Sequence, residues 1–271
     1  MKNNNKFKEK KQKDFQSKKS FNIEKNQEKG EEENKDKSPY VYQRDKIGFE
    51  LSIRNLEWTE KQKRFIELAL DKNTRLMLIK GPAGTSKTML AVYAALHLLN
   101  SKKVSDIIYL RSAVESSEAS LGFLPGTADE KLAFYNLPFW DKLTELLDVN
   151  LIKKLNESER IHCFPINFIR GLNWNAKAII LDEAQNSSYK EIVTSLTRLG
   201  HFSRCFILAD PMQADLKSHK CGGFSKLYDI FANDQEAKDF GIHTFEFTSE
   251  DVKRSELAAF LVKKLEGVKI D

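Results

Sequence analysis

Short apolar runs alternate with stretches of helical spacing along the chain from about residue 58 onwards. The runs of strand length are 75–80, 106–110, 178–181, 205–209 and 244–247. The stretches whose apolar residues recur at helical spacing are 58–71, 89–100, 139–155, 188–199, 224–231 and 256–265. Buried strands are short apolar runs, and strands that alternate with helices form parallel sheets covered on both faces. The pattern therefore predicts an α/β fold with a mostly parallel central sheet and helices on both faces.

Glycine and proline mark two boundaries in this pattern. The stretch 111–138 contains Gly122-Phe123-Leu124-Pro125-Gly126 and is too long to be an ordinary connection. We expect it to be irregular as far as Pro138, where the next helix begins. Gly200 directly follows the stretch 188–199 and is expected to be the C-cap of that helix, because glycine commonly ends helices.

The N-terminal 45 residues differ in composition from the rest of the chain. Residues 1–20 carry eight lysines against two acidic residues, whereas residues 21–38 carry four lysines against six acidic residues. A segment so poor in apolar residues cannot bury enough surface to offset its loss of conformational entropy. We therefore expect residues 1–45 to be a disordered charged tail and residues 46–271 to be one folded domain. The tail could be a basic arm for nucleic acid or a solubilising segment, and the sequence favours neither.

The sequence also bears on the compartment. No apolar stretch of 7–15 residues follows the N-terminal lysines, so the tail does not look like a secretory signal, and no run approaches the length of a membrane helix. The cysteines Cys163, Cys205 and Cys221 form no C-x-x-C pair, which suits a reducing cytoplasm. Cys205 is expected to be a small core residue, and His219-Lys220-Cys221 lacks further ligands at the spacing of a metal site.

A phosphate-binding loop follows the apolar run at 75–80 and precedes the helical stretch at 89–100. It consists of Gly81, Pro82, Ala83, Gly84, Thr85, Ser86, Lys87 and Thr88. The context of strand, glycine-rich turn and helix is the one that this motif requires. Backbone N–H groups of such a turn and the N-terminus of the helix bind polyphosphate. Lys87 is expected to reach the β- and γ-phosphates and Thr88 to ligate Mg²⁺.

Ser86 departs from the motif G-x-x-x-x-G-K-[ST] as it is usually met, since a glycine is expected directly before the lysine. If that position requires a positive φ, a serine costs on the order of 1 kcal/mol. We therefore expect the loop to form, with nucleotide binding better assured than fast turnover.

Two acidic residues, Asp182 and Glu183, follow the apolar run at 178–181. An acid at the end of a strand beside bound phosphates can hold Mg²⁺ through water, and a second acid can activate the attacking water. An adjacent Asp-Glu pair favours hydrolysis over transfer to a bound acceptor. The alternative for Glu183 is a helix-capping acid that interacts with the dipole of the following helix.

Four further residues are candidates for the same site. Gln213, in Asp210-Pro211-Met212-Gln213, could orient the γ-phosphate and its water, or could belong to a plain turn. Arg198 could stabilise transition-state charge or interact with a helix C-terminus. Arg254 is a candidate arginine finger or a surface arginine. Gln62 could cap a helix with Thr59 and could also bind the adenine edge.

In an open parallel sheet, ligands bind beyond the carboxyl ends of the strands. The phosphate-binding loop, the pair Asp182-Glu183 and Asp210 each follow a predicted strand. We therefore expect all three to converge on one crevice.

From Trp58 to the C-terminus the chain resembles the PhoH-like ATPases, which are relatives of superfamily 1 helicases. The resemblance depends on these motifs: G-P-A-G-T-S-K-T, L-R-S-A-V-E followed by L-G-F-L-P-G, F-I-R-G, I-I-L-D-E-A-Q-N, L-T-R-L-G, A-D-P-M-Q-A-D-L and D-V-K-R. It implies a single RecA-like P-loop NTPase core, ATP as ligand and a hexameric ring. It also implies that these residues occupy nucleotide-site positions: Gln62, Lys87, Thr88, Asp182, Glu183, Gln213 and Arg254.

Three residues depart from the family pattern: Ser86 replaces a glycine, Ser112 replaces the proline that usually follows Arg111, and Ala209 replaces a glycine before Asp210. Arg111 and Arg170 lie where helicase-like folds meet nucleic acid or a neighbouring subunit, and each could equally be a core arginine. The leading hypothesis is an ATPase with Mg²⁺ as cofactor, coupled to single-stranded RNA in a ring-shaped homo-oligomer. The alternatives are a nucleotide-dependent RNA- or protein-binding module with little turnover and, more weakly supported, a small-molecule kinase.

Overall fold

A computed structural model describes residues 46–112, 128–169, 173–213 and 223–253, with the backbone alone at 128–135 and a few helical positions beyond residue 256. The chain divides into two compact units, 1–43 and 44–271, and the described residues belong to the second. The charged tail, the glycine-rich segment at 122–126, Cys221, Arg170 and Arg254 lie outside the described residues. The division of the chain at residue 45 therefore stays a prediction. Within the described part of the chain, no helix has both the length and the apolar character needed to span a membrane.

The second unit is built on a six-stranded sheet in which every pair of neighbouring strands is parallel. The strands are β1 Leu76–Lys80, β2 Asp106–Arg111, β3 Ile161–Pro165, β4 Lys177–Asp182, β5 Arg204–Ala209 and β6 Ile242–Glu246. Their order across the sheet is β3-β2-β4-β5-β1-β6. The sheet confirms the predicted α/β fold with a parallel central sheet, and the apolar runs in the sequence mark five of its strands.

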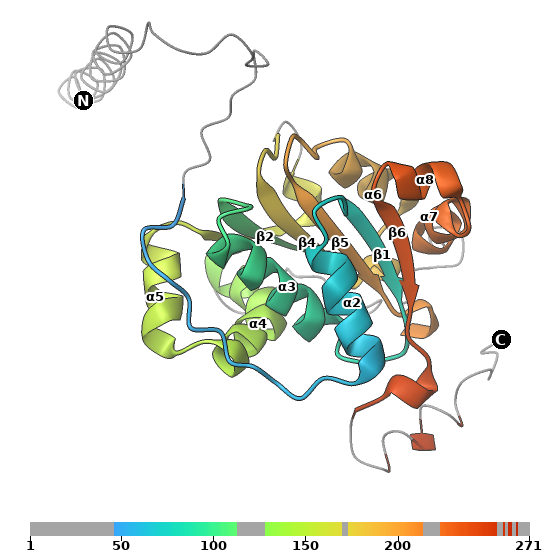
Figure 1. Cartoon of the computed structure of the whole chain (residues 1–271), viewed down its shortest axis with the longest axis horizontal. Coiled ribbons are helices and arrows are strands. Elements are labelled where there is room, and N and C mark those ends of the chain that lie inside the picture. The colour runs from blue at the N-terminus through green and yellow to red at the C-terminus, as the bar shows by residue number, and fades with distance from the viewer. Residues whose placement is uncertain are drawn as a thin grey trace, which may run out of the picture. The chain divides into compact units, whose positions relative to one another are not determined.

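Helices cover both faces of this sheet (Figure 1). One face packs against α2 Glu60–Leu70, α3 Lys87–Asn100, α4 Ala128–Leu146 and α5 Val149–Glu157. The other face carries α6 Tyr189–Leu196, α7 Gly223–Phe231 and α8 Gln235–Asp239. Short 3₁₀ turns lie at Ile166–Phe168, Ala184–Asn186, Pro211–Gln213 and Ser249–Asp251. The helix α3 lies centrally on its face, and its residues from Met89 to Leu96 are all buried.

Helix α4 corrects the prediction for the region between residues 111 and 155. It begins at Ala128 rather than after Pro138, which lies inside the helix. A proline removes one backbone N–H and usually ends a helix, but here Phe139 and Leu143 are fully buried on the next turn. The expected single helix at 139–155 is two helices, because Asp148 accepts a hydrogen bond from the N–H of Asn150 and starts α5 anew.

Three smaller differences concern the second half of the chain. The edge strand β3 was not predicted, because its half-buried residues include His162 and give no continuous apolar run; the five-residue helix α8 was missed as well. Gly200 is not a helix C-cap: α6 ends at Leu196 with Thr197 as its cap, and the N–H of Gly200 donates to the carbonyl oxygen of Trp174 at 2.7 Å. The expected last helix at 256–265 lies largely outside the described residues.

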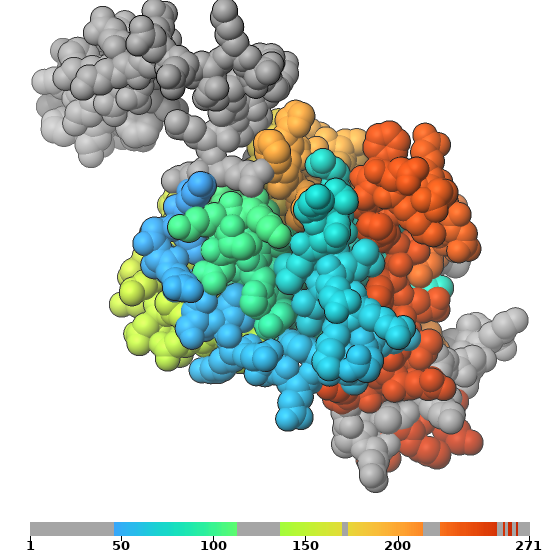
Figure 2. Space-filling model, in the orientation of Figure 1, coloured from blue at the N-terminus to red at the C-terminus, as the bar shows by residue number. Residues whose placement is uncertain are grey.

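An extended segment, residues 46–58, crosses the helical layer before it reaches α2 (Figure 2). The N–H of Leu51 donates to Oδ1 of Asn100 at 2.8 Å, and the N–H of Arg54 donates to the carbonyl oxygen of Leu146 at 2.8 Å. Within this segment, the side chains of Ile47 and Leu51 are buried. The segment is therefore fixed to the C-terminal ends of α3 and α4 at Leu51 and Arg54, on its way to α2.

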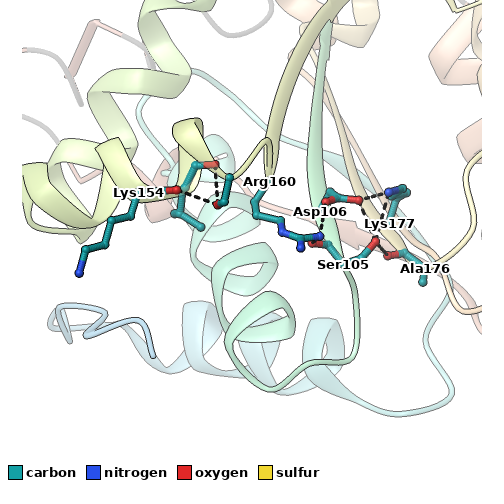
Figure 3. A network of polar contacts seen from close by, with 8 residues as sticks. Ser105, Asp106, Lys154, Arg160, Ala176 and Lys177 are labelled. Atoms are coloured by element: carbon teal, nitrogen blue, oxygen red, sulfur yellow. Dashed lines mark hydrogen bonds and ion pairs between the residues drawn. The ribbon is translucent and has the colours of Figure 1, made fainter. Parts of the chain in front are cut away.

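The amino ends of β2 and β4 are joined by a buried charge network around Asp106 (Figure 3). Asp106 is 6% exposed and forms ion pairs with Arg160, at 3.2 Å, and with Lys177. The hydroxyl of Ser105 donates to Oδ2 of Asp106 at 2.8 Å. A buried carboxylate is tolerated only where charge and hydrogen bonds compensate its lost hydration. The network therefore ties together three strands at the edge of the sheet remote from the carboxyl ends.

We expect Asp106→Asn to lower the free energy of unfolding by about 2 kcal/mol, because hydrogen bonds to a charged group are lost. Such a loss corresponds to a fall in Tm of roughly 4–8 °C for a domain of this size. Thermal unfolding monitored by circular dichroism measures the change. The matched control is Asp229→Asn, at an exposed position on α7, and an equal effect of the two substitutions would contradict the prediction.

Candidate nucleotide-binding site

A cavity of about 460 Å³ lies at the carboxyl edge of the sheet. Its walls include residues of the phosphate-binding loop, of the ends of β4 and β5, and of the segment before α2. The lining residues that the sequence had singled out are Gln62, Ala83, Gly84, Ser86, Lys87, Thr88, Asp182, Glu183, Ala209, Asp210 and Gln213. The expectation that the loop, the acidic pair and Asp210 converge on one crevice is confirmed.

The start of the phosphate-binding loop is packed tightly against neighbouring strands. The N–H of Gly81 donates to the carbonyl oxygen of Ala209 at 3.2 Å. A Cβ atom at Gly81 would lie 2.7 Å from Cβ of Phe247, so no side chain fits there. Further along, the buried hydroxyl of Thr85 donates to the carbonyl oxygen of Pro82 at 2.9 Å. These contacts within the protein restrain the shape of the loop.

Ser86 adopts the left-handed conformation that the motif reserves for glycine. Its φ is 66° and its ψ is 24°, and its side chain makes no capping hydrogen bond although it stands at the N-cap of α3. The left-handed region costs a residue with a Cβ atom roughly 1–2 kcal/mol. The serine therefore stores backbone strain directly before Lys87.

Lys87 lies against its own loop. Its Nζ donates to the carbonyl oxygens of Gly81, at 2.6 Å, and Pro82, at 2.9 Å. Burial lowers the pKa of Lys87, while the nearby carboxylates of Asp210, Asp182 and Glu183 raise it. A cation surrounded by acidic groups and loop carbonyls is well placed to meet an anionic ligand in the cavity.

Asp182 has hydrogen-bond donors on both of its oxygen atoms. Oδ2 accepts from the hydroxyl of Thr88 at 3.0 Å and from the buried phenol of Tyr109 at 2.9 Å. Oδ1 accepts from the N–H of Glu183 at 3.0 Å. Because Thr88 uses its proton toward the carboxylate, the lone pairs of its oxygen stay available.

Thr88 and Asp182 supply the hydroxyl and carboxylate oxygens that Mg²⁺ prefers, so the residues present fit this ion. Among the described residues, no three His, Cys, Asp or Glu side chains gather as a metal-binding group. A P-loop metal shares its coordination with phosphate oxygens and water. The pair Thr88 and Asp182 therefore matches a metal that enters with a nucleotide.

Glu183 lies beside Asp182 in a left-handed backbone conformation, with φ of 55°. Its Oε2 accepts a hydrogen bond from the amide of Gln185 at 2.5 Å, and Arg111 lies 3.8 Å from its Oε1. Burial and the charge of Asp182 raise the pKa of Glu183, against the lowering effects of Gln185 and Arg111. Its side chain makes no capping hydrogen bond to the following 3₁₀ turn, and the alternative of an interaction with the helix dipole stays a prediction.

Gln185 connects Glu183 with Asp210, a role that was not predicted from the sequence. The side chain is 4% exposed, and its Oε1 accepts from the N–H of Asp210 at 2.9 Å while its amide nitrogen contacts Glu183. The only sequence signal was its place in the motif of Asp182 and Glu183. Oδ1 of Asp210 in turn accepts from the N–H of Met212, which shapes the turn that places Gln213 at the cavity.

Gln62 combines a structural role with a place in the cavity wall. Its side chain is almost fully buried, at 1% exposure. Oε1 accepts from the N–H of Thr59 at 3.0 Å, and the hydroxyl of Thr59 accepts from the N–H of Gln62 at 3.2 Å. The predicted capping box is confirmed, and contact with an adenine edge stays a prediction.

Of the candidate arginines that the structure describes, neither Arg111 nor Arg198 lines the cavity. The carbonyl oxygen of Arg198 accepts from the N–H of Trp174 at 2.9 Å. Arg111 contacts Glu183, and Arg170 and Arg254 lie outside the described residues.

Of the residues that depart from the family pattern, Ser112 donates its hydroxyl to the carbonyl oxygen of Asn186 at 2.7 Å. Cys205 is a buried core residue as expected, and burial raises the pKa of its thiol to about 12.

Comparison with known proteins gives a consistent result. The family model described as PhoH-like protein matches residues 56–266. The chain is 41% identical over 204 residues to a PhoH-like protein of Mycobacterium tuberculosis, a match that covers 75% of this chain and 56% of that protein. A PhoH-like protein of Bacillus subtilis is 36% identical over 196 residues, with coverage of 72% and 60%. The chain thus spans little more than half the length of the curated relatives it matches.

Two solved structures are similar at lower levels. The large terminase of a thermophilic bacteriophage gives a TM-score of 0.44 at 10% identity, with coverage of 78% of this chain and 50% of the terminase. A Pif1 helicase gives a TM-score of 0.32 at 16% identity, with coverage of 71% and 44%.

We expect Gly81→Ala to destabilise the protein by about 1–3 kcal/mol, because the new methyl group must displace Phe247 or the loop. Nucleotide affinity should fall with it, since the loop begins at this residue. Urea unfolding and titration with a fluorescent ATP analogue measure the two effects. The matched control is Gly48→Ala, where an added Cβ meets nothing within 4 Å; equal effects at both glycines would refute the assignment.

Proposed function

The chain belongs to the PhoH-like protein family and is a P-loop NTPase. We propose that it binds ATP with Mg²⁺ and hydrolyses it, and that this hydrolysis is coupled to single-stranded RNA. The observation that carries the proposal is the hydrogen bond between Thr88 and Asp182, at 3.0 Å, with Glu183 next to it in the cavity of the phosphate-binding loop. Hydrolysis by activated water requires a hydroxyl that ligates the metal, a carboxylate that orients the metal and a second carboxylate. All three groups lie in this one cavity.

Binding would begin with the triphosphate in the loop formed by residues 81–88. Lys87 would exchange the carbonyl oxygens of Gly81 and Pro82 for β- and γ-phosphate oxygens. Thr88 would offer its oxygen to Mg²⁺, and Asp182 would hold a water of the metal. Bound Mg²⁺ would neutralise the negative charge that develops on the phosphates. Gln62 would contact the adenine edge at the wall formed with Trp58.

Glu183 is proposed as the base that takes a proton from the attacking water. Its raised pKa increases its basicity. The amide nitrogen of Gln185 donates to one of its oxygens, while the oxygen of Gln185 accepts from the N–H of Asp210. Gln213 would orient the water and the γ-phosphate from the turn after β5. Arg254 would act as an arginine finger, from this subunit or from a neighbour.

Coupling to RNA requires more than one subunit. A single RecA-like core cannot both hold a strand and move along it, so the proposal includes a ring of six copies, which the family resemblance implies. The lysine-rich residues 1–20 support contact with phosphate backbones. Arg111 and Arg170 are proposed at the face that meets RNA or the next subunit. The cytoplasm is the proposed location, from the reduced cysteines that the sequence suggests.

The experiment that tests this function is steady-state release of inorganic phosphate from Mg-ATP, with and without single-stranded RNA. We expect RNA to stimulate release in the wild-type chain. Glu183→Gln should lower kcat by about 10²–10⁴-fold, because the base is lost, while ATP still binds. Lys87→Ala should abolish release.

A conservative substitution outside the cavity, Asp229→Asn, provides the control for this series. Release that is identical in the wild type, Lys87→Ala and Glu183→Gln would contradict the hydrolysis proposal. Release that RNA leaves unchanged, with a monomeric protein in the presence of ATP and RNA, would contradict the coupling and the ring. A phosphorylated acceptor in place of free phosphate would favour the kinase alternative.

A second candidate function is a nucleotide-dependent binding module with little turnover. One observation favours it: the left-handed conformation of Ser86, which stores backbone strain directly before Lys87. In this function ATP would order the protein for RNA or protein partners without rapid hydrolysis.

Ser86→Gly distinguishes the two functions. Under the hydrolysis proposal we expect kcat to rise less than tenfold, because the strain at Ser86 exists before and during the reaction and largely cancels from the barrier. A rise of tenfold or more, which corresponds to about 1.4 kcal/mol of barrier, would show that the serine slows turnover. Ser101→Gly, at the other end of α3, controls for the removal of a serine side chain from this helix.

A further inference from the structure

Three side chains at the carboxyl end of β2 contact the segment that carries the two acidic site residues. The phenol of Tyr109 donates to Asp182 at 2.9 Å, Arg111 lies 3.8 Å from Glu183, and Ser112 donates to the carbonyl oxygen of Asn186 at 2.7 Å. The first of these contacts reaches the carboxylate to which we assign the metal.

Tyr109 is held in place by burial and by aromatic stacking. Its side chain is fully buried, and its ring stacks on Phe139 of α4 with a centroid distance of 4.8 Å and an interplanar angle of 18°. A hydroxyl on a ring held in this way cannot follow a carboxylate that moves. A buried hydrogen bond to a charged acceptor is also among the stronger ones in proteins.

The acceptor sites of Asp182 are almost all used. A carboxylate offers about four lone-pair sites, and Thr88 and Tyr109 occupy two on Oδ2 while the N–H of Glu183 occupies one on Oδ1. About one site is left, and it is on Oδ1. Without Tyr109 the carboxylate would keep a second free site on Oδ2 and fewer restraints on its rotation.

We propose that Tyr109 is a positioning residue for the metal: its hydroxyl saturates Oδ2 of Asp182 and leaves Oδ1 as the acceptor for metal-bound water. The inference rests on the proposed function of the site as a Mg-ATP site. It adds a residue that the P-loop motif and the acidic motif do not include. It also makes α4, through Phe139, part of the support of the metal site.

The test is the Mg²⁺ dependence of nucleotide binding by the full chain. A fluorescent ATP analogue is titrated in EDTA and at a series of Mg²⁺ concentrations, which gives a metal-free Kd and a Mg²⁺ midpoint. For Tyr109→Phe, which keeps the stacked ring, we expect the Mg²⁺ midpoint to rise three- to tenfold with a metal-free Kd within twofold of the wild type.

The matched control is Tyr228→Phe. This tyrosine is also largely buried but packs on the opposite face of the sheet, with Thr244 as its hydrogen-bond partner. Its removal should leave both quantities within twofold of the wild type.

An unchanged Mg²⁺ midpoint in Tyr109→Phe would overturn the inference while the proposed function stands. An equal loss of metal-free and Mg²⁺-dependent binding would also overturn it, because it would show a general packing defect. A wild-type protein whose nucleotide binding does not respond to Mg²⁺ would instead refute the proposed function, and the inference with it.

Discussion

The parallel register of the central strands is the constraint on which the rest of this protein depends. Lys80 of β1 pairs with Ala209 of β5, and Leu181 of β4 pairs with Ile207. Gly81 and Asp210 follow their strands and Asp182 is the last residue of β4, so all three leave the sheet at nearly the same level. Parallel strands need helical crossovers, so both faces are covered, and the charge network of Asp106 and the acidic pair lie at opposite ends of the strands. The cavity is a consequence of this arrangement.

The two ends of the sheet use charge in different ways. At the amino edge, Asp106 is compensated by Arg160, Lys177 and Ser105, which satisfies it without leaving room for a ligand. At the carboxyl edge, Asp182 and Glu183 lie beside one cavity, and Lys87 turns toward loop carbonyls. The first arrangement stabilises the sheet; the second keeps like charges close together, as sites for phosphate and metal commonly do.

Two residues with strained backbone conformations lie at the same edge. Ser86 and Glu183 both have a positive φ. Ser86 directly precedes Lys87, and Glu183 is the proposed base. Such conformations persist only where the surrounding structure holds them. Here the hold comes from the buried α3 behind Ser86 and from the contacts of Gln185 with Glu183 and Asp210. Preorganisation of the site therefore depends on packing several residues away from any ligand.

The parallel α/β core, the phosphate-binding loop and the convergence of the acidic residues could be predicted from the chain, because apolar runs, motif spacing and strand ends depend on consecutive residues. The capping box of Gln62 and the departure at Ser86 could be predicted in the same way. The support that Tyr109 and Gln185 give to the acidic pair could not, since these contacts join residues of β2 with residues at the ends of β4 and β5. The same holds for α4, where Pro138 suggested an end and the buried Phe139 and Leu143 allowed the helix to continue. Local rules predict what neighbours in the chain do; burial and long-range hydrogen bonds depend on partners that a linear pattern does not name.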